Sequence, residues 1–325
     1  MMSADTHRQL LARAFDYADE LTLAYQGGEP TLVGLDWFKQ AVSDCKSMNQ
    51  RGIPVHFAIQ TNGMRIDDAW AEFFAGESFL VGLSIDGTRD THDKNRVDGK
   101  DRGSYATVSK AARILQAHNV ELNILTVVNA VTARHAKQIY DSFKKSGHNW
   151  LQFIPCLNPL GETNKKYPFS LTPDLYGEFL CRLFDCWYDD IMKGDYISIR
   201  WFDNLVMMLR GMMPECCGMA GVCSEQNVIE ANGDVYPCDF YVLDEYKIGN
   251  VFEHSFEQID KMRKNSDFIR ASEAVHEKCR GCDWYALCRG GCKRHRDGTE
   301  DGLCYFCESY DRFFRYSIER LLRLK

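Results

Sequence analysis

The chain has 325 residues, of which 45% are hydrophobic, 26% charged and 12% aromatic. This composition is typical of a globular protein and excludes a disordered or fibrous one, and the length leads us to expect two domains. The net charge of −7 argues against a general nucleic-acid or anionic-membrane binder. No apolar run approaches the length of about 18 residues expected of a membrane span, so we expect a cytoplasmic protein with no nucleic-acid or membrane partner.

From residue 3 to about residue 200, short apolar runs alternate with longer segments of helical period. Strands are expected at 20–26, 54–60, 79–85, 121–128 and 149–155. Helices are expected at 3–18, where Ser3 is a suitable N-cap, and at 35–50, 65–76, 104–119, 132–147 and 172–194. Strands that alternate with helices predict a parallel sheet with right-handed crossovers.

Each expected strand runs into a polar or glycine-bearing segment: QGGEP (26–30), QTNG (60–63), SIDG (84–87), VVN (127–129) and IPCLN (154–158). These segments would share one rim of the sheet, which is where a (β/α) barrel builds its active site. We therefore favour a barrel over a doubly wound sheet. The chain opens on a helix, whereas a barrel opens on a strand. The predicted fold class is therefore α/β, a partial (β/α)6 TIM-like barrel lacking its first strand.

The character of the chain changes after about residue 205, where cysteines become frequent and helical periodicity weakens. We expect a barrel domain at 1–205 and a cysteine-rich domain at 206–325. Within the second, 227–238 predicts a β-hairpin with a type I′ turn at Asn232-Gly233, which places Ala231 opposite Asp234. Segment 307–325 predicts a helix that packs on the barrel through an apolar stripe at Tyr310, Phe314, Ile318 and Leu321.

Ten cysteines lie in the last part of the chain, at 216, 217, 223, 238, 279, 282, 288, 292, 304 and 307. A tetrahedral thiolate site takes four ligands, so the number suits two metal sites with two spare cysteines. Zinc ribbons also use C-x2-C pairs, so spacing alone leaves zinc and iron–sulfur clusters open. The other cysteines are scattered and are expected to be free thiols packed as small apolar groups: Cys45, Cys156, Cys181 and Cys186.

Rim segments and cysteines together resemble one known family. The segments that carry the resemblance are AYQGGEPTLVGLDWF, HFAIQTNGM, VGLSIDG with HDKNRVDGKDRGSY, LQFIPCLN, VCSEQNVIEANGDVYPCDFYV, KIGNV, KCRGCDWYALCRGGCKR and FCESYDRFF. In this order they resemble radical S-adenosylmethionine enzymes with a SPASM domain, and among these the anaerobic sulfatase-maturating enzymes. The resemblance runs from the first helix almost to the last residue.

The resemblance implies two auxiliary [4Fe–4S] clusters in the second domain. One would be held by Cys217, Cys223, Cys238 and Cys292. The other would be held by Cys279, Cys282, Cys288 and Cys307. Cys307 is preferred to Cys304 because the family's last ligand precedes an aromatic stretch, and Cys217 is preferred to Cys216 for its spacing to Cys223.

The resemblance also implies a site for S-adenosylmethionine. Gly28 would offer its backbone to the methionine part, Ser84 and Arg96 would serve the ribose and carboxylate, and Leu157 would contact the adenine. Taken singly, each could have a structural role instead: a turn glycine, a local hydrogen bond, a solvated charge, a core side chain. Asp239 would be the general base for the target thiol or hydroxyl, with the alternative that it orients the cluster loop.

The chain departs from the family at one motif. The C-x3-C-x2-C triplet that holds the third, cleaving [4Fe–4S] cluster does not occur in this sequence. We expect the triplet upstream of Met1, together with the missing first strand, in a gene whose start was misplaced. A natural variant that has lost radical chemistry is the alternative. As supplied, the chain is expected to be inactive.

The function implied is radical oxidation of a sulfatase Cys or Ser to Cα-formylglycine. The partners would be a sulfatase polypeptide and an electron donor such as flavodoxin or ferredoxin. Two other functions stay open: another peptide-modifying enzyme with a SPASM domain, or a non-catalytic iron–sulfur module for electron transfer or peptide binding.

Overall fold

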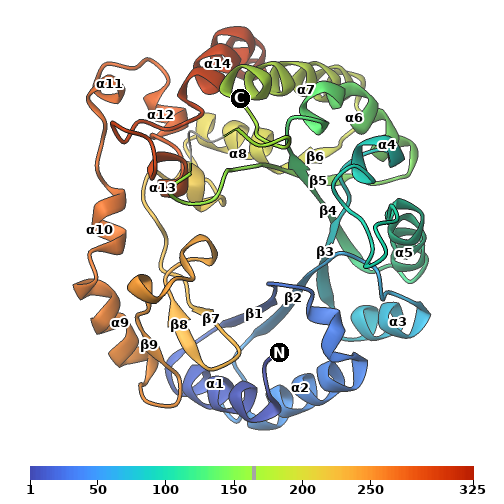
Figure 1. Ribbon diagram of the computed structural model, residues 1–325, viewed down its shortest axis with the longest axis vertical. Coiled ribbons are helices and arrows are strands. Elements are labelled where there is room, and N and C mark those ends of the chain that lie inside the picture. Colours follow the sequence, from blue (N-terminus) through green and yellow to red (C-terminus); the bar gives the residue numbers. More distant parts are fainter. Residues whose placement is uncertain (163–165) are drawn as a thin grey trace.

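Six parallel strands form a curved sheet in the order in which they occur along the chain (Figure 1). The computed structural model describes residues 1–162 and 166–325. The strands are β1 (Leu21–Tyr25), β2 (Val55–Thr61), β3 (Phe79–Ser84), β4 (Glu121–Val128), β5 (Trp150–Pro155) and β6 (Ser198–Ile199). A doubly wound sheet reverses its strand order at a switch point, and this sheet has no reversal among the described strands. The barrel-like fold class is confirmed.

Helices cover the outer face of this sheet (Figure 1). α1 (Ala4–Tyr17) begins where expected, because the Ser3 side chain accepts a hydrogen bond from the Thr6 N–H. The others are α2 (Leu35–Met48), α3 (Asp68–Gly76), α4 (Arg89–His92), α5 (Tyr105–Ala117), α6 (Ala136–Lys145), α7 (Pro173–Lys193) and α8 (Arg200–Leu209). Since α2, α3, α5, α6 and α7 return the chain to the start of the next strand of this sheet, the strand ends meet at one rim.

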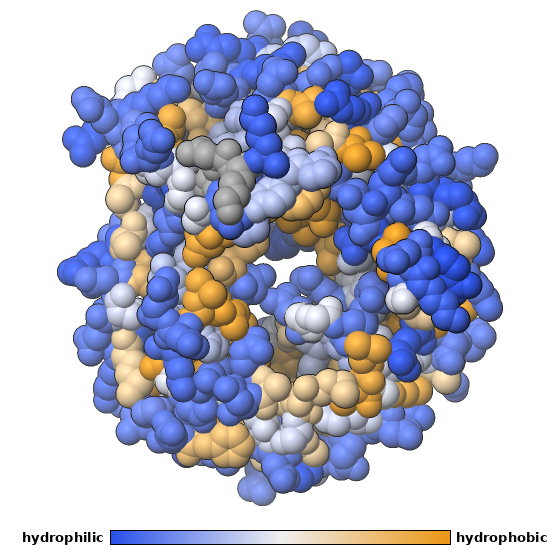
Figure 2. Space-filling view, in the orientation of Figure 1, coloured by the Kyte–Doolittle hydropathy of each residue, from blue (hydrophilic) through white to orange (hydrophobic). Residues whose placement is uncertain are grey.

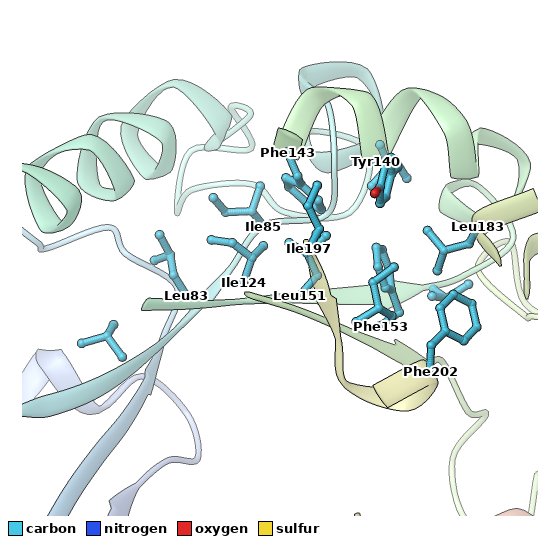
Figure 3. Close-up of a cluster of buried hydrophobic side chains, with 14 of the residues drawn as sticks. Leu83, Ile85, Ile124, Tyr140, Phe143, Leu151, Phe153, Leu183, Ile197 and Phe202 are labelled. Carbon is cyan, nitrogen blue, oxygen red and sulfur yellow. The ribbon is translucent and has the colours of Figure 1, made fainter. Parts of the chain in front are cut away.

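The main core lies between the sheet and these helices (Figure 3). Strand side chains meet side chains of α6, α7 and α8, among them Leu83, Ile124, Leu151, Phe153, Tyr140, Phe143, Leu183 and Phe202. Burying a side chain of this size contributes about 1.5–3 kcal/mol. Tyr140 brings one polar group into this layer, its hydroxyl. The hydroxyl donates a hydrogen bond to the Asp190 carboxylate at 2.9 Å and is therefore not left unpaired.

Two elements at the end of the barrel were not expected from the sequence. β6 has two residues and pairs with β5 only through Trp150 with Ser198 and Leu151 with Ile199. Such a short strand has no alternation to detect. α8 follows it directly and buries Phe202 and Leu205 against the barrel core.

The second part of the chain contains a small antiparallel sheet and short helices. β7 (Val228–Ile229), β8 (Asp234–Tyr236) and β9 (Gly249–Asn250) form the sheet. The helices are α9 (Phe256–Asn265), α10 (Phe268–Ser272), α11 (Glu277–Arg280), α12 (Tyr285–Cys288), α13 (Lys293–Arg296) and α14 (Cys307–Leu322). The hairpin and the last helix are confirmed.

The turn of the hairpin differs from the expected one. β7 and β8 pair so that Glu230 faces Asp234, which leaves three residues in the loop. The Gly233 N–H donates to the Glu230 carbonyl at 2.9 Å, and Gly233 alone in this loop has a positive φ, of 87°. Asn232 uses its side chain to bond Asp234 instead of adopting the left-handed conformation that a type I′ turn needs. The predicted two-residue turn, with Ala231 opposite Asp234, is therefore wrong. The loop is one residue longer, and Glu230 is the residue opposite Asp234.

This second part closes the open side of the curved sheet (Figure 1). At one seam α14 packs along α7, and Ser309 on α14 donates to the Pro173 carbonyl at 2.6 Å. At the other seam α9 lies on α1, and Gln9 donates to the Val251 carbonyl at 3.2 Å. A separate small core forms there from Ala14, Val235, Ile248, Val251, Phe256 and Ile259.

The closed ring leaves an opening in the middle of the molecule, bordered by both apolar and polar residues (Figure 2). The rim loops of the sheet and the cysteine-rich loops both approach it in Figure 1. None of the helices in the described ranges 1–162 and 166–325 is both long and apolar enough to cross a membrane.

Candidate functional site

The loop after β1 has an open backbone. Gly27 and Gly28 both have positive φ, 87° and 54°, a conformation that side chains disfavour. A Cβ atom added at either glycine would meet nothing within 4 Å. The two peptides therefore leave free space at the rim, as a site that takes a ligand against its backbone requires.

Glu29 fastens this loop to the loop after β2. Its carboxylate accepts from the Thr31 N–H at 3.1 Å, the Thr61 hydroxyl at 2.8 Å and the Asn62 N–H at 2.7 Å. The Thr31 hydroxyl donates to it as well, at 2.5 Å. One carboxylate thus fixes two neighbouring rim loops, which holds Gly27 and Gly28 in place.

The Glu29→Gln variant should be less stable than the parent by about 2–3 kcal/mol, because an amide loses the charge and half of the acceptor sites in this arrangement. Urea unfolding of the metal-free chain measures the difference. Glu77→Gln is the control, since Glu77 pairs with Lys46 at the surface and should change stability by less than about 1 kcal/mol. Equal stability of the two variants would contradict this role for Glu29.

Ser84 and Arg96 lie at the next rim position. Ser84 ends β3 and is half-buried, and its hydroxyl makes no hydrogen bond with any residue among 1–162 and 166–325. Arg96 follows α4, and its side chain is 26% exposed. Its guanidinium Nε donates to Asp86 at 2.6 Å. One free hydroxyl and one partly free guanidinium therefore face the space at the end of β3.

Leu157 lies after β5, on a loop that the second part of the chain contacts. The Cys156 N–H donates to the Val128 carbonyl at 2.8 Å, which places Leu157 just beyond the ends of β4 and β5. Leu157 lines a small cavity together with Arg294 and Tyr305. Arg294 donates to the Asn158 carbonyl at 2.6 Å. The cysteine-rich part thus contacts the same rim that carries Gly28, Ser84 and Arg96.

The first proposed cysteine group comes from three separate segments. Cys217 begins η3 (Cys217–Met219), Cys238 follows the hairpin, and Cys292 precedes α13. The pKa of the Cys292 thiol is raised to about 11, chiefly by burial; the Cys217 and Cys223 sulfurs also act to raise it, and backbone N–H groups of residues 294 and 295 act to lower it. Burial raises the pKa of the Cys238 thiol to about 12, with Asp239 and Cys292 adding to the effect. These four cysteines are electrostatic neighbours.

The second proposed group is formed by α11, α12 and the start of α14. The pKa of the Cys288 thiol is raised to about 12, chiefly by burial; the N–H of residue 290 acts to lower it, and Cys307, Cys279 and Cys282 act to raise it. Cys307 is the first residue of α14, and its thiol pKa is raised by burial and by Cys279 and Cys282. The four cysteines of this group are again neighbours of one another.

Backbone amides directed at sulfur suit iron–sulfur clusters, because they offset the negative charge of thiolates in a site away from water. The N–H groups after Cys238, Cys288 and Cys292 do this here. Within the described ranges, no group of three or more His, Cys, Asp or Glu side chains could hold a metal ion as the side chains stand. Because each cysteine of a four-iron cluster binds a different iron atom, the four sulfurs of a group need not meet at one point.

The two spare cysteines occupy different surroundings. Cys304 is 5% exposed and interacts electrostatically with Cys288, Cys307 and Cys292, so it lies between the two groups. Cys216 precedes Cys217 and is half-buried, with its backbone N–H donating to Asn204 at 3.1 Å. The preference for Cys307 and Cys217 as ligands stays a prediction.

Asp239 is exposed and starts the short turn η4 (Asp239–Tyr241) directly after Cys238. The Cys238 thiol donates to its carboxylate at 3.3 Å. Exposure leaves the second carboxylate oxygen accessible to a substrate group. The position is compatible with both roles considered for it, proton acceptor and support for the cluster loop.

Several residues that build the site were missed. Glu29 and Asp86 lie within the quoted motifs QGGEP and SIDG, yet only their neighbours were assigned roles. An acidic residue beside a rim glycine is a detectable signal. Arg294 had no such signal, because its partner lies 136 residues away.

Comparisons with known proteins identify related sequences and structures. Residues 216–283 match the SPASM family, described as an iron-sulfur cluster-binding domain. The cysteine-type anaerobic sulfatase-maturating enzyme of Clostridium novyi is 45% identical over 99% of this chain and 87% of that protein. The serine-type enzyme of Bacteroides thetaiotaomicron is 31% identical over 91% of this chain and 76% of that protein.

A solved structure agrees as well. It is described as native anSMEcpe with bound AdoMet and Kp18Cys peptide, and it superimposes with a TM-score of 0.97 at 41% identity, covering 100% of this chain and 91% of that one. Cysteine spacing left two kinds of site open, zinc sites and iron–sulfur clusters. These comparisons support iron–sulfur clusters. The chain belongs to the anaerobic sulfatase-maturating enzymes, a family of radical S-adenosylmethionine enzymes that carry a SPASM iron–sulfur domain.

Proposed function

We propose that this chain, when joined to a C-x3-C-x2-C segment, which does not occur in this sequence, acts on a cysteine of a sulfatase polypeptide and oxidises it to Cα-formylglycine. The observation that carries the choice of cysteine over serine is identity: three cysteine-type enzymes are 42–45% identical, whereas three serine-type enzymes are 27–31% identical. The structural relative anSMEcpe was solved with a peptide named for cysteine, which supports the same choice.

The cofactor site that we propose lies at the rim. The Gly28 backbone would receive the methionine part, Ser84 the ribose, Arg96 the carboxylate and Leu157 the adenine. The open space at Gly28, the free Ser84 hydroxyl and the partly exposed Arg96 guanidinium support this assignment. When bound, S-adenosylmethionine would supply the radical chemistry at this rim, and the auxiliary clusters would supply electron transfer.

The residues of this chain have two tasks in the reaction. Asp239 takes the proton of the substrate thiol, so that in total the substrate side chain loses one hydrogen atom from Cβ, one proton from sulfur and one electron. The resulting thioaldehyde reacts with water to give formylglycine and hydrogen sulfide. The second task belongs to the ligands, which we propose to be Cys217, Cys223, Cys238 and Cys292 for one cluster, and Cys279, Cys282, Cys288 and Cys307 for the other.

Three further features complete the proposal. The division into a barrel domain at 1–205 and an auxiliary-cluster domain at 206–325 is retained, because the SPASM match lies within the second range. Electrons are expected to pass to or from a small carrier such as flavodoxin or ferredoxin. A cytoplasmic location suits a chain with 14 cysteines whose thiols must stay reduced to bind iron.

The test uses two synthetic peptides that differ only in a cysteine or serine at the target position. With enzyme reconstituted in a form that includes the C-x3-C-x2-C triplet, and with S-adenosylmethionine and reductant, we expect the cysteine peptide to exchange its thiol for an aldehyde, read by mass spectrometry. The serine peptide should react at least tenfold more slowly, since one lost or altered polar contact costs about 1–2 kcal/mol. Equal rates would contradict a cysteine-type assignment, and a thioether product would contradict sulfatase maturation.

A further inference from the structure

We propose that Asp86, His92 and Ser104 are positioning residues that hold Arg96 at both its side chain and its backbone. The proposal rests on the proposed function, because it gives a purpose to Arg96 as the residue facing the carboxylate of S-adenosylmethionine. It concerns residues that lie behind the rim and do not themselves face the open space. Asp86 is 2% exposed, His92 0% and Ser104 6%.

The side-chain contact is a two-point ion pair. Arg96 Nε donates to Asp86 Oδ2 at 2.6 Å, and Nη2 donates to Asp86 Oδ1 at 3.3 Å. Asp86 is itself fixed, since its Oδ1 accepts from the Val127 N–H on β4 at 2.8 Å. The carboxylate therefore aligns the guanidinium with the end of the sheet.

This alignment leaves one edge of the guanidinium available. Of the five N–H donors of an arginine, Asp86 uses one on Nε and one on Nη2. The donors on Nη1 and the second donor on Nη2 remain, and these two nitrogens form the fork that binds a carboxylate in a bidentate manner. Holding one edge thus orients the other edge for a ligand.

The backbone contact is a chain of hydrogen bonds with a fixed direction. The Asp86 N–H donates to His92 Nδ1 at 3.1 Å, so Nδ1 must be an unprotonated acceptor. The hydrogen of the neutral ring then lies on Nε2, which donates to the Ser104 hydroxyl at 2.9 Å. Ser104 in turn donates to the Arg96 carbonyl at 3.0 Å.

The two contacts form a closed ring. It runs from the Asp86 carboxylate to the Arg96 side chain, and from the Arg96 carbonyl through Ser104 and His92 back to the Asp86 amide. Every polar atom that links the ring has a partner within it, and the Arg96 carbonyl accepts from the Ser104 N–H as well, at 3.2 Å, so the loop is held at several points. We infer that this ring pre-organises Arg96, so that binding a carboxylate requires no reordering of the loop.

The test measures equilibrium binding of two ligands to the cluster-loaded enzyme: S-adenosylmethionine, and 5′-methylthioadenosine, which has the adenosine and sulfur but no carboxylate. For Ser104→Ala we expect the Kd of S-adenosylmethionine to rise about tenfold, and that of 5′-methylthioadenosine to stay within about twofold. Asp86→Asn should give the same selective loss. Ser104→Thr keeps the hydroxyl and should restore binding.

Arg102→Ala is the matched control, because Arg102 is in the same loop and pairs with the exposed side of Asp98 without contacting Arg96. It should leave both affinities unchanged. A loss of affinity for both ligands in Ser104→Ala and Asp86→Asn would show a general structural role and overturn the proposal, and so would unchanged binding in both.

Arg96→Lys separates this proposal from the proposed function. If Arg96→Lys binds S-adenosylmethionine as well as the parent does, the assignment of Arg96 to the carboxylate fails. If Arg96→Lys weakens binding selectively while Ser104→Ala and Asp86→Asn do not, the cofactor site stands and the positioning ring fails.

Discussion

Replacing Cys292 by alanine in this chain is expected to remove one auxiliary cluster, and the same change in a form that carries the C-x3-C-x2-C triplet is expected to abolish formylglycine formation. Cys292 is a half-buried thiol that receives backbone hydrogen bonds and has Cys217 and Cys223 as electrostatic neighbours. With alanine there, three cysteines are left to hold four irons. Iron per reconstituted chain should fall from about eight to about four, measured by iron and sulfide analysis.

The control for this prediction is Cys304→Ala. Cys304 lies between the two groups and outside both proposed ligand sets. This variant should retain all the iron. Its free energy of unfolding should fall by about 1–2 kcal/mol, because the packing contacts of the buried sulfur are lost. A Cys292→Ala variant with full iron content would refute the first ligand set, and loss of a cluster from Cys304→Ala would refute the choice of Cys307.

Replacing Asp239 by asparagine is expected to lower turnover by about 10²–10⁴-fold, the usual contribution of a general base. Asparagine keeps the shape of the side chain and cannot take the substrate proton. The affinity for S-adenosylmethionine and the iron content should not change, since neither depends on proton transfer. Single-turnover assays with the cysteine peptide measure the effect.

Asp244→Asn is the matched control for Asp239, because both carboxylates are exposed and begin short turns in the same segment, the second being η5 (Asp244–Tyr246). It should be as active as the parent. If Asp239→Asn loses iron or alters the absorption of the cluster, the carboxylate supports the loop of Cys238 and is not the base.

Most of the barrel could be predicted because its elements are long and periodic. β4 and α7, for example, begin and end within one or two residues of the expected bounds. β6 could not be, since two residues carry no periodicity and the strand exists only through its pairing with β5. In the second part, α10 to α13 have four or five residues each. Their positions therefore depend more on the surrounding loops and cysteines than on helical propensity.

The candidate site shows the same limit. Gly28 and Ser84 could be named because their neighbours form motifs of a known family. The ring around Arg96 could not be, because it depends on how α4 and its following loop fold back, bringing His92 within reach of both Asp86 and Ser104. Sequence patterns do not reveal these contacts, even though the four residues of the ring lie within twenty positions of one another.

The two seams that close the molecule have a consequence for its synthesis. Val251 lies 242 residues after its partner Gln9, and Ser309 lies 136 residues after Pro173. On the ribosome, the sheet can therefore assemble well before the polypeptide that joins its two margins has emerged. Contacts between such distant segments form slowly. The nascent chain thus passes through a stage in which the two margins of the sheet are not yet joined by the second part of the chain.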